Sequence, residues 1–106
     1  MTTETDMKSI SPVELRNWKE TGKDFQLIDI REDYEVADET IGGHHIRMEE
    51  VIARVSELRK DIPVVIHCKS GRRSSAVAYV LEMQFKLDNL YTLEGGISAA
   101  LEAGIR

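Results

Sequence analysis

The sequence has a single cysteine, Cys68, and this scarcity removes two common roles for a cysteine. One thiol cannot form a disulfide within the chain, nor can it supply a cysteine-rich zinc site. Three histidines without a nearby carboxylate pattern do not make a metal site either, so we expect no bound metal. Cys68 is therefore either a small buried hydrophobic residue or a reactive thiol.

Other absences narrow the class of protein. No apolar run approaches the length of a membrane span, and the polar first residues do not resemble a secretory signal, so we expect a cytoplasmic protein without a membrane partner. The sequence contains neither G-x-G-x-x-G nor G-x-x-x-x-G-K-[ST], and we expect no organic cofactor. A formal net charge of −5 argues against nucleic acid as a partner, because neutralising phosphates requires a basic face.

Charge is distributed unevenly along this acidic chain. Residues 32–39 carry five acids and no base, which is typical of a solvated surface. By contrast, Lys69, Arg72 and Arg73 lie in one short segment beside the only thiol. Positive charge is thus concentrated at Cys68, which packing alone rarely requires.

The length of 106 residues predicts one domain, 1–106, with a polar and flexible amino terminus over about residues 1–8. The pattern predicts these elements: a helix over 12–21 with Ser11 as its cap, strands over 25–30, 64–67 and 90–93, and helices over 48–60, 74–87 and 97–103. Short apolar strands that alternate with helices predict an α/β fold, with a central, mostly parallel sheet of four to five strands and helices on both faces. Ligands bind such sheets at the carboxyl ends of the strands, which here means the segment after His67.

The segment HCKSGRRSS, 67–75, lies at that position. We expect Cys68 at the end of a strand, facing a helix start whose unpaired N–H groups, together with the three cations, favour the thiolate. Such settings lower a thiol pKa from about 8.5 to roughly 3.5–7.5, so we expect Cys68 to be a nucleophile at neutral pH. Gly71 lets successive N–H groups turn inward as an anion cradle, and Ser74 is expected to cap the next helix. We therefore interpret 68–74 as an anion site rather than as a loop needed for packing.

Three segments carry a resemblance to a known family. The loop HCKSGRRS, 67–74, resembles the active-site loop of single-domain members of the rhodanese homology family. The segment LIDIRE, 27–32, is similar to the family's early strand, and LEGGISA, 93–99, is similar to its late glycine signature. Residues 42–48 and Ala100 depart from the usual pattern, but the resemblance covers about residues 9–104.

The resemblance implies a rhodanese-like fold and a sulfurtransferase activity. The Cys68 thiolate would attack a sulfane-sulfur donor, such as thiosulfate or a persulfide, and hold the sulfur as a Cys68 persulfide. A thiol or a cyanide-like nucleophile would then accept the sulfur, and a protein could serve as donor or acceptor. Such a reaction requires a small sulfur-containing anion as substrate.

The resemblance also implies which residues form the site. The residues expected to bind substrate follow the cysteine directly: Lys69, Ser70, Gly71, Arg72, Arg73 and Ser74. Arg72 and Arg73 are the leading anion ligands, since a guanidinium fork suits a sulfur oxyanion, while Lys69 lies at the rim. Asp29 and Arg31 are expected to support the site through ion pairing, although ordinary strand-end polar residues would look the same. His67 is expected to turn away from the pocket into a satisfied structural role.

Two other functions remain open on the sequence. Cysteine phosphatases and arsenate reductases use a cysteine, five residues and an arginine, but here the sixth residue after Cys68 is Ser74 and Arg73 comes one position early. The domain could also be a non-catalytic binding module, or a persulfide carrier that depends on a protein partner. The sequence does not name the physiological donor, the acceptor or the oligomeric state.

Overall fold

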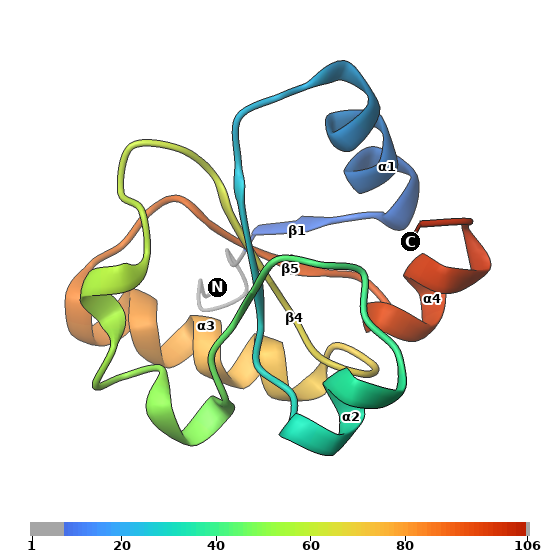
Figure 1. The fold of residues 1–106 in the computed structure, drawn as a ribbon. Coiled ribbons are helices and arrows are strands. Elements are labelled where there is room, and N and C mark those ends of the chain that lie inside the picture. Colours follow the sequence, from blue (N-terminus) through green and yellow to red (C-terminus); the bar gives the residue numbers. More distant parts are fainter. Residues whose placement is uncertain (1–7, 106) are drawn as a thin grey trace, which may run out of the picture.

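A five-stranded parallel sheet forms the centre of the computed structural model, which describes residues 8–105 (Figure 1). The strands are β1 (Lys8–Ile10), β2 (Gln26–Asp29), β3 (His44–His45), β4 (Val64–His67) and β5 (Leu90–Leu93). The helices are α1 (Pro12–Thr21), α2 (Asp33–Asp38), α3 (Arg72–Phe85) and α4 (Gly96–Glu102), with two short 3-10 helices, η2 (Met48–Glu50) and η3 (Val55–Glu57). The strand order is β1-β5-β4-β2-β3 and all four pairings are parallel, which confirms the predicted α/β class.

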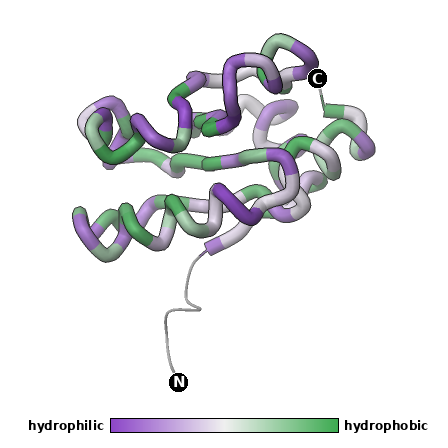
Figure 2. Tube along the Cα trace, turned by 90° about the horizontal axis from the view of Figure 1, so that it is seen from below, coloured by the Kyte–Doolittle hydropathy of each residue, from purple (hydrophilic) through white to green (hydrophobic). Residues whose placement is uncertain are grey.

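The sheet separates two apolar clusters, which take alternate residues of the same strands. Leu27 and Val65 face α1 and α4, whereas Ile28 and Ile66 face α3 and the segment that holds η2 and η3. Figure 1 shows α1 and α4 on one side of the sheet and α3 on the other. Seen from below, the inner layer is largely hydrophobic and the hydrophilic residues lie mostly on the outer turns (Figure 2). Burial on both faces is the usual state of an all-parallel sheet.

Local signals define α1 as the sequence predicts. The Ser11 hydroxyl accepts the Glu14 N–H at 3.1 Å, and the Glu14 carboxylate accepts the Ser11 N–H at 3.0 Å, which completes a capping box. The helix ends at Gly22, whose φ of 74° is readily available to glycine. Inside α1, Leu15 is fully buried, which confirms that it belongs to the core.

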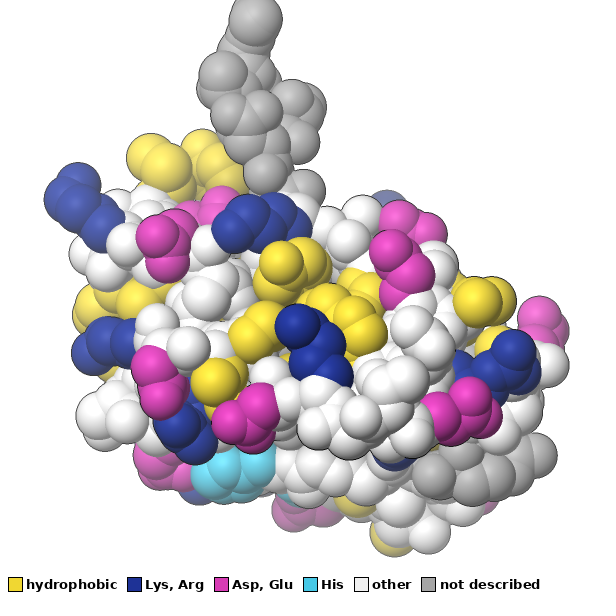
Figure 3. Space-filling model, turned by 90° about the horizontal axis from the view of Figure 1, so that it is seen from above, with side chains coloured by type: hydrophobic (Ala, Val, Ile, Leu, Met, Phe, Trp, Pro, Cys, Tyr) yellow, Lys and Arg dark blue, Asp and Glu magenta, His cyan; other side chains and the backbone are white. Residues whose placement is uncertain are grey.

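Aromatic residues close the end of the molecule opposite the cysteine segment. Trp18 packs against Phe25 and Tyr91, with ring centroids 5.5 and 5.6 Å apart, and the Lys23 ammonium lies 5.1 Å from the Trp18 ring. On this face apolar side chains gather around a basic side chain (Figure 3). Trp18 is thus a packing residue.

The predicted helix over 48–60 is wrong. The chain forms only η2 and η3 there, joined by turns, although Val51 and Leu58 are buried as the apolar spacing required. The Gln26 side chain explains the difference, because its amide binds the Glu57 carbonyl at 2.9 Å and the Arg59 N–H at 2.7 Å. These contacts tie the end of the segment to β2, and tertiary contacts override helix propensity.

Two further boundaries differ from the expectations. Helix α3 begins at Arg72, with Gly71 at its cap position, so the expectation that Ser74 caps this helix is wrong. Gly71 has a φ of 104° and turns the chain into the helix two residues early. At the amino terminus, residues 1–7 of the segment expected to be flexible lie outside the described residues, and Lys8 belongs to β1, where it pairs with Tyr91.

Within residues 8–105, no helix combines the length and the apolar character needed to cross a bilayer. In the same residues, no group of three or more His, Cys, Asp or Glu side chains is arranged to hold a metal ion.

The two faces of α1 allow a matched test of the core. Leu15→Ala should lower the free energy of unfolding by about 2–5 kcal/mol, because the fully buried side chain leaves a cavity. Val13→Ala removes a side chain that is 60% exposed on the same helix and should change stability by less than about 0.5 kcal/mol. Urea unfolding of both variants measures the difference, and equal losses would contradict this arrangement of the core.

Candidate active site

Cys68 lies directly after β4, where the chain turns into α3. The N–H groups of Gly71 and Ser74 donate to its Sγ atom at 3.2 and 3.4 Å, and Ser74 Oγ lies 3.7 Å from the sulfur. The Ser74 N–H belongs to the first turn of α3, where backbone donors have no partner within the helix. The only thiol of the chain is therefore buried inside a ring of backbone donors.

These donors determine the protonation state of the thiol. Burial raises the pKa of Cys68, but its hydrogen bonds with the N–H and the side chain of Ser74, followed by those with the N–H groups of Gly71 and Ser70, lower it more. The pKa therefore falls below its ordinary value, as the sequence analysis expected. The largest lowering effects come from these hydrogen bonds rather than from the neighbouring cations.

Helix α4 holds the backbone of the cysteine loop in this conformation. The Ile97 N–H donates to the Cys68 carbonyl at 2.8 Å, and the Ser98 N–H donates to the Lys69 carbonyl at 3.2 Å. In a trans peptide the C=O and the N–H point in opposite directions. Since the Lys69 carbonyl points to α4, the Ser70 N–H of the same peptide unit is turned toward the thiol.

Gly96 makes this close approach possible. A Cβ at this position would lie 2.3 Å from the Lys69 carbonyl oxygen and 2.6 Å from the Cys68 carbonyl oxygen, and its φ is 63°. The sequence analysis recognised the Gly95-Gly96 pair only as a family signature and missed its role as the support of the cysteine loop. Two consecutive glycines before a helix were the available signal.

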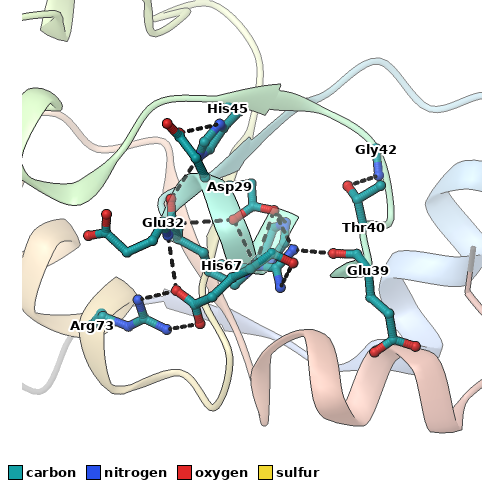
Figure 4. A network of polar contacts seen from close by, with 11 residues as sticks. Asp29, Glu32, Glu39, Thr40, Gly42, His45, His67 and Arg73 are labelled. Atoms are coloured by element: carbon teal, nitrogen blue, oxygen red, sulfur yellow. Dashed lines mark hydrogen bonds and ion pairs between the residues drawn. The ribbon is translucent and has the colours of Figure 1, made fainter. Parts of the chain in front are cut away.

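The three cations of the cysteine loop differ in their ion pairing. Arg73 donates from both terminal nitrogens to the two carboxylate oxygens of Glu35, each at 2.9 Å (Figure 4). This contact differs from the expectation that Arg73 is a leading anion ligand, because Glu35 already occupies its guanidinium fork. Lys69 and Arg72 are exposed and have no ion-pair partner within residues 8–105.

Glu35 also corrects the interpretation of residues 32–39 as plain solvated surface. Its carboxylate is only 15% exposed, and the hydrogen bond from Arg73 lowers its pKa to about 2. The sequence analysis missed this residue, which lies 38 positions before its partner. No local pattern connects two residues so far apart.

Asp29 and Arg31 form the ion pair that the sequence analysis expected, and it is buried. The Arg31 guanidinium lies 2.9 Å from Asp29 Oδ2 and also donates to the carbonyls of Glu35 and Glu39 at 3.3 and 2.7 Å. Burial raises the pKa of Asp29, but the hydrogen bonds and charges of Arg31, together with His67, lower it overall. The pair therefore holds α2 beside the site through Glu35 in the middle of the helix and Glu39 at its carboxyl end.

A cavity of about 780 Å³ lies between α2 and α4. Tyr34 and Glu35 line it from α2, Ile97 and Ser98 line it from α4, and Lys69 lines it from the cysteine loop. Its size is typical of a cavity that accepts an organic ligand. The cavity therefore lies beside the cysteine loop, which contributes Lys69 to its wall.

His67 precedes Cys68 but faces Asp29 on β2, with Nε2 3.8 Å from Asp29 Oδ2. Its ring is fully buried, and neither nitrogen has a hydrogen-bond partner among the described residues. The expectation of a satisfied structural role is therefore wrong in this respect. Burial lowers the pKa of His67 to about 4, although Asp29 opposes this effect.

The buried His67 makes the fold sensitive to acid. Its pKa is about 4 in the folded chain against 6.5 for an ordinary histidine, so the unfolded state binds more protons between these values. We expect this residue to remove about 3 kcal/mol of stability between pH 7 and pH 4, a loss that grows as the pH falls below 6.5.

Unfolding by urea at a series of pH values measures this effect. His67→Gln should flatten the loss of stability over this range, whereas His44→Gln, at an exposed histidine, should leave it unchanged. An unchanged pH dependence in a folded His67→Gln protein would show that another group causes the acid sensitivity.

Comparisons with known proteins agree with this geometry. Residues 11–103 match the family model of the rhodanese-like domain. YtwF of Bacillus subtilis, a candidate sulfurtransferase, is 40% identical over 96 residues, which span 89% of this chain and 90% of that protein. A sulfurtransferase of Allochromatium vinosum is 36% identical over 85 residues, or 78% of each protein. A rhodanese-like domain protein of Staphylococcus aureus has a TM-score of 0.80 at 32% identity and covers 89% of this chain and 91% of its own.

Proposed function

The chain belongs to the rhodanese-like domain family, and on this basis we propose that it is a sulfurtransferase that carries sulfane sulfur as a persulfide on Cys68. The observation that supports this proposal best is the convergence of the Gly71 and Ser74 N–H groups on the Cys68 sulfur. Backbone donors held in this way stabilise an anion at a fixed position without reorganisation. Both the thiolate and a persulfide are such anions.

The first half of the reaction loads the cysteine. The Cys68 thiolate attacks the outer sulfur of the donor, a bond forms between the two sulfur atoms, and the S–S bond of the donor breaks. The electron pair of that bond leaves with the donor fragment, which is sulfite from thiosulfate or a thiolate from an organic persulfide. The product is a Cys68 persulfide anion, and no other oxidant or reductant is required.

The second half of the reaction transfers the sulfur. A nucleophilic acceptor such as a thiolate or cyanide attacks the outer sulfur, and the electron pair of the S–S bond returns to Cys68. The backbone donors then hold the regenerated thiolate for the next cycle, and the lowered pKa of Cys68 makes it a good leaving group.

Exposed residues around the cysteine supply positive charge, and a neighbouring cavity gives room for a donor. Lys69 and Arg72 are exposed beside the cysteine and supply positive charge to an approaching anion. The cavity between α2 and α4 gives room for an organic donor, and an exposed rim also allows a protein to deliver or receive sulfur. No organic cofactor is needed for either half of the reaction, and reducing cytoplasm is a suitable location for a reactive thiol.

The alternative functions receive less support from the geometry. A cysteine phosphatase needs an arginine free to bind the phosphoryl oxygens, but the Arg73 fork is bound to Glu35. A persulfide carrier that depends on a protein partner would share the loading step. Turnover with a small acceptor distinguishes this carrier from an enzyme.

Intact-mass measurement of the protein tests the proposed function. After incubation with thiosulfate or cysteine persulfide, the native protein should gain the mass of one sulfur atom and lose it again on addition of cyanide. Cys68→Ser, which removes only the nucleophilic sulfur, should gain nothing. The proposal fails if neither donor loads the native protein or if the serine variant gains the same mass.

A further inference from the structure

The ion pair between Glu35 and Arg73 controls how much positive charge the site offers to a donor. We propose that Glu35 is a specificity-determining residue that disfavours doubly charged inorganic donors such as thiosulfate and favours singly charged organic persulfides. This inference rests on the proposed sulfurtransferase function and narrows its substrate class.

The pair occupies the face of the Arg73 guanidinium that would otherwise bind an anion through two parallel hydrogen bonds. Both terminal nitrogens are bound, each to a different oxygen of the Glu35 carboxylate at 2.9 Å. Such a two-fold contact matches the planar guanidinium and is difficult for a small anion to displace. Arg73 lies in the first turn of α3, next to Ser74, so its charge is close to the sulfur yet neutralised.

Glu35 is held in place independently of Arg73. Its Oε1 atom accepts the N–H of Glu32 at 2.9 Å, which closes a capping box at the start of α2. The buried Arg31 side chain binds the Glu35 carbonyl at 3.3 Å and so fixes the same turn. The carboxylate is therefore already in position before any donor arrives, and its pKa of about 2 keeps it charged at neutral pH.

The cavity beside the loop is consequently not a strongly positive site. Glu35, Asp38 and Glu39 line it, against Lys69 and Arg31. Glu35 is paired with Arg73 and Arg31 with Asp29, so the carboxylates of Asp38 and Glu39 face the single positive charge of Lys69. A dianion meets twice the repulsion from these carboxylates that a monoanion meets at the same distance. Charge in this cavity thus favours a donor with one net negative charge.

The size and lining of the cavity favour the same class of donor. Its volume of about 780 Å³ far exceeds the space needed by a five-atom inorganic anion. Tyr34 and Ile97 add apolar surface on opposite sides of the cavity, which an organic group can contact and thiosulfate cannot. An organic persulfide that contacts this surface lies next to Lys69, the residue that follows Cys68 in the chain.

Single-turnover loading tests the proposal. The second-order rate constant for formation of the Cys68 persulfide is measured with thiosulfate and with cysteine persulfide, by quenching and intact mass. Glu35→Gln retains an oxygen that can accept the Glu32 N–H but leaves the Arg73 charge unneutralised. We expect the ratio of the thiosulfate rate to the cysteine persulfide rate to rise about fivefold, because the donors differ by one unit of charge.

Two further variants test whether a change in the rate ratio comes from the unpaired Arg73 side chain or from the loss of any negative charge in the cavity. Asp38→Asn removes one negative charge from the same cavity and should raise the ratio much less, since Asp38 has no ion pair with Arg73 in residues 8–105. The double variant Glu35→Gln with Arg73→Gln should return the ratio to near its original value. Partial unfolding would expose the buried Cys68 to both donors alike, so the ratio of the two rates, rather than either rate alone, reports the role of Glu35.

The outcomes distinguish this inference from the function on which it rests. If the native protein loads from both donors and Glu35→Gln leaves their ratio unchanged, the role of Glu35 is overturned while the sulfurtransferase function stands. An equal rise in Asp38→Asn overturns it as well, because Arg73 would then play no special part. If the native protein loads from neither donor, both proposals fail.

Discussion

The chemistry of this domain depends on the way α4 holds two carbonyl groups of the cysteine loop. The Ile97 and Ser98 N–H groups bind the carbonyls of Cys68 and Lys69, which turns the N–H groups of Lys69 and Ser70, in the same two peptide units, to the other side. Only a residue without a Cβ fits at Gly96, because the loop backbone lies against it. The sheet, α3 and α4 thus act together to direct backbone dipoles at one sulfur atom, and the lowered pKa of Cys68 follows from this arrangement.

A second layer of interactions fixes α2 beside this loop. The buried pair of Asp29 and Arg31 binds the backbone of α2, and Glu35 then reaches across to Arg73 at the start of α3. Arg73, which the sequence suggests as an anion ligand, is therefore bound within the protein and holds α2 against α3. The exposed cations Lys69 and Arg72 are those left to meet a substrate. The site therefore combines a strong local cradle with a weak overall positive field.

The parts of the fold that the sequence predicts well are those with short-range causes. The strand Val64–His67 follows Pro63, the strand Leu90–Leu93 precedes two glycines, and the capping box at Ser11 starts α1, so each boundary has a local signal. The position of Cys68 at a strand end also follows from these boundaries.

Other features depend on contacts between residues that lie far apart in the sequence. The Gln26 side chain binds the end of the segment 48–60, and the Glu35 carboxylate binds Arg73, contacts that no spacing in the sequence reveals.

The pKa of Cys68 at low and at high salt tests the central claim most directly. Ultraviolet absorbance of the thiolate during a pH titration of the native protein gives this value, since the chain has one cysteine. If N–H groups in contact with the sulfur stabilise the thiolate, the pKa lies below the ordinary value of about 8.5 and hardly changes with salt, because contacts at this range are not screened. A pKa at or above that value, or one lowered only at low salt, would contradict the account and assign the effect to the surrounding cations.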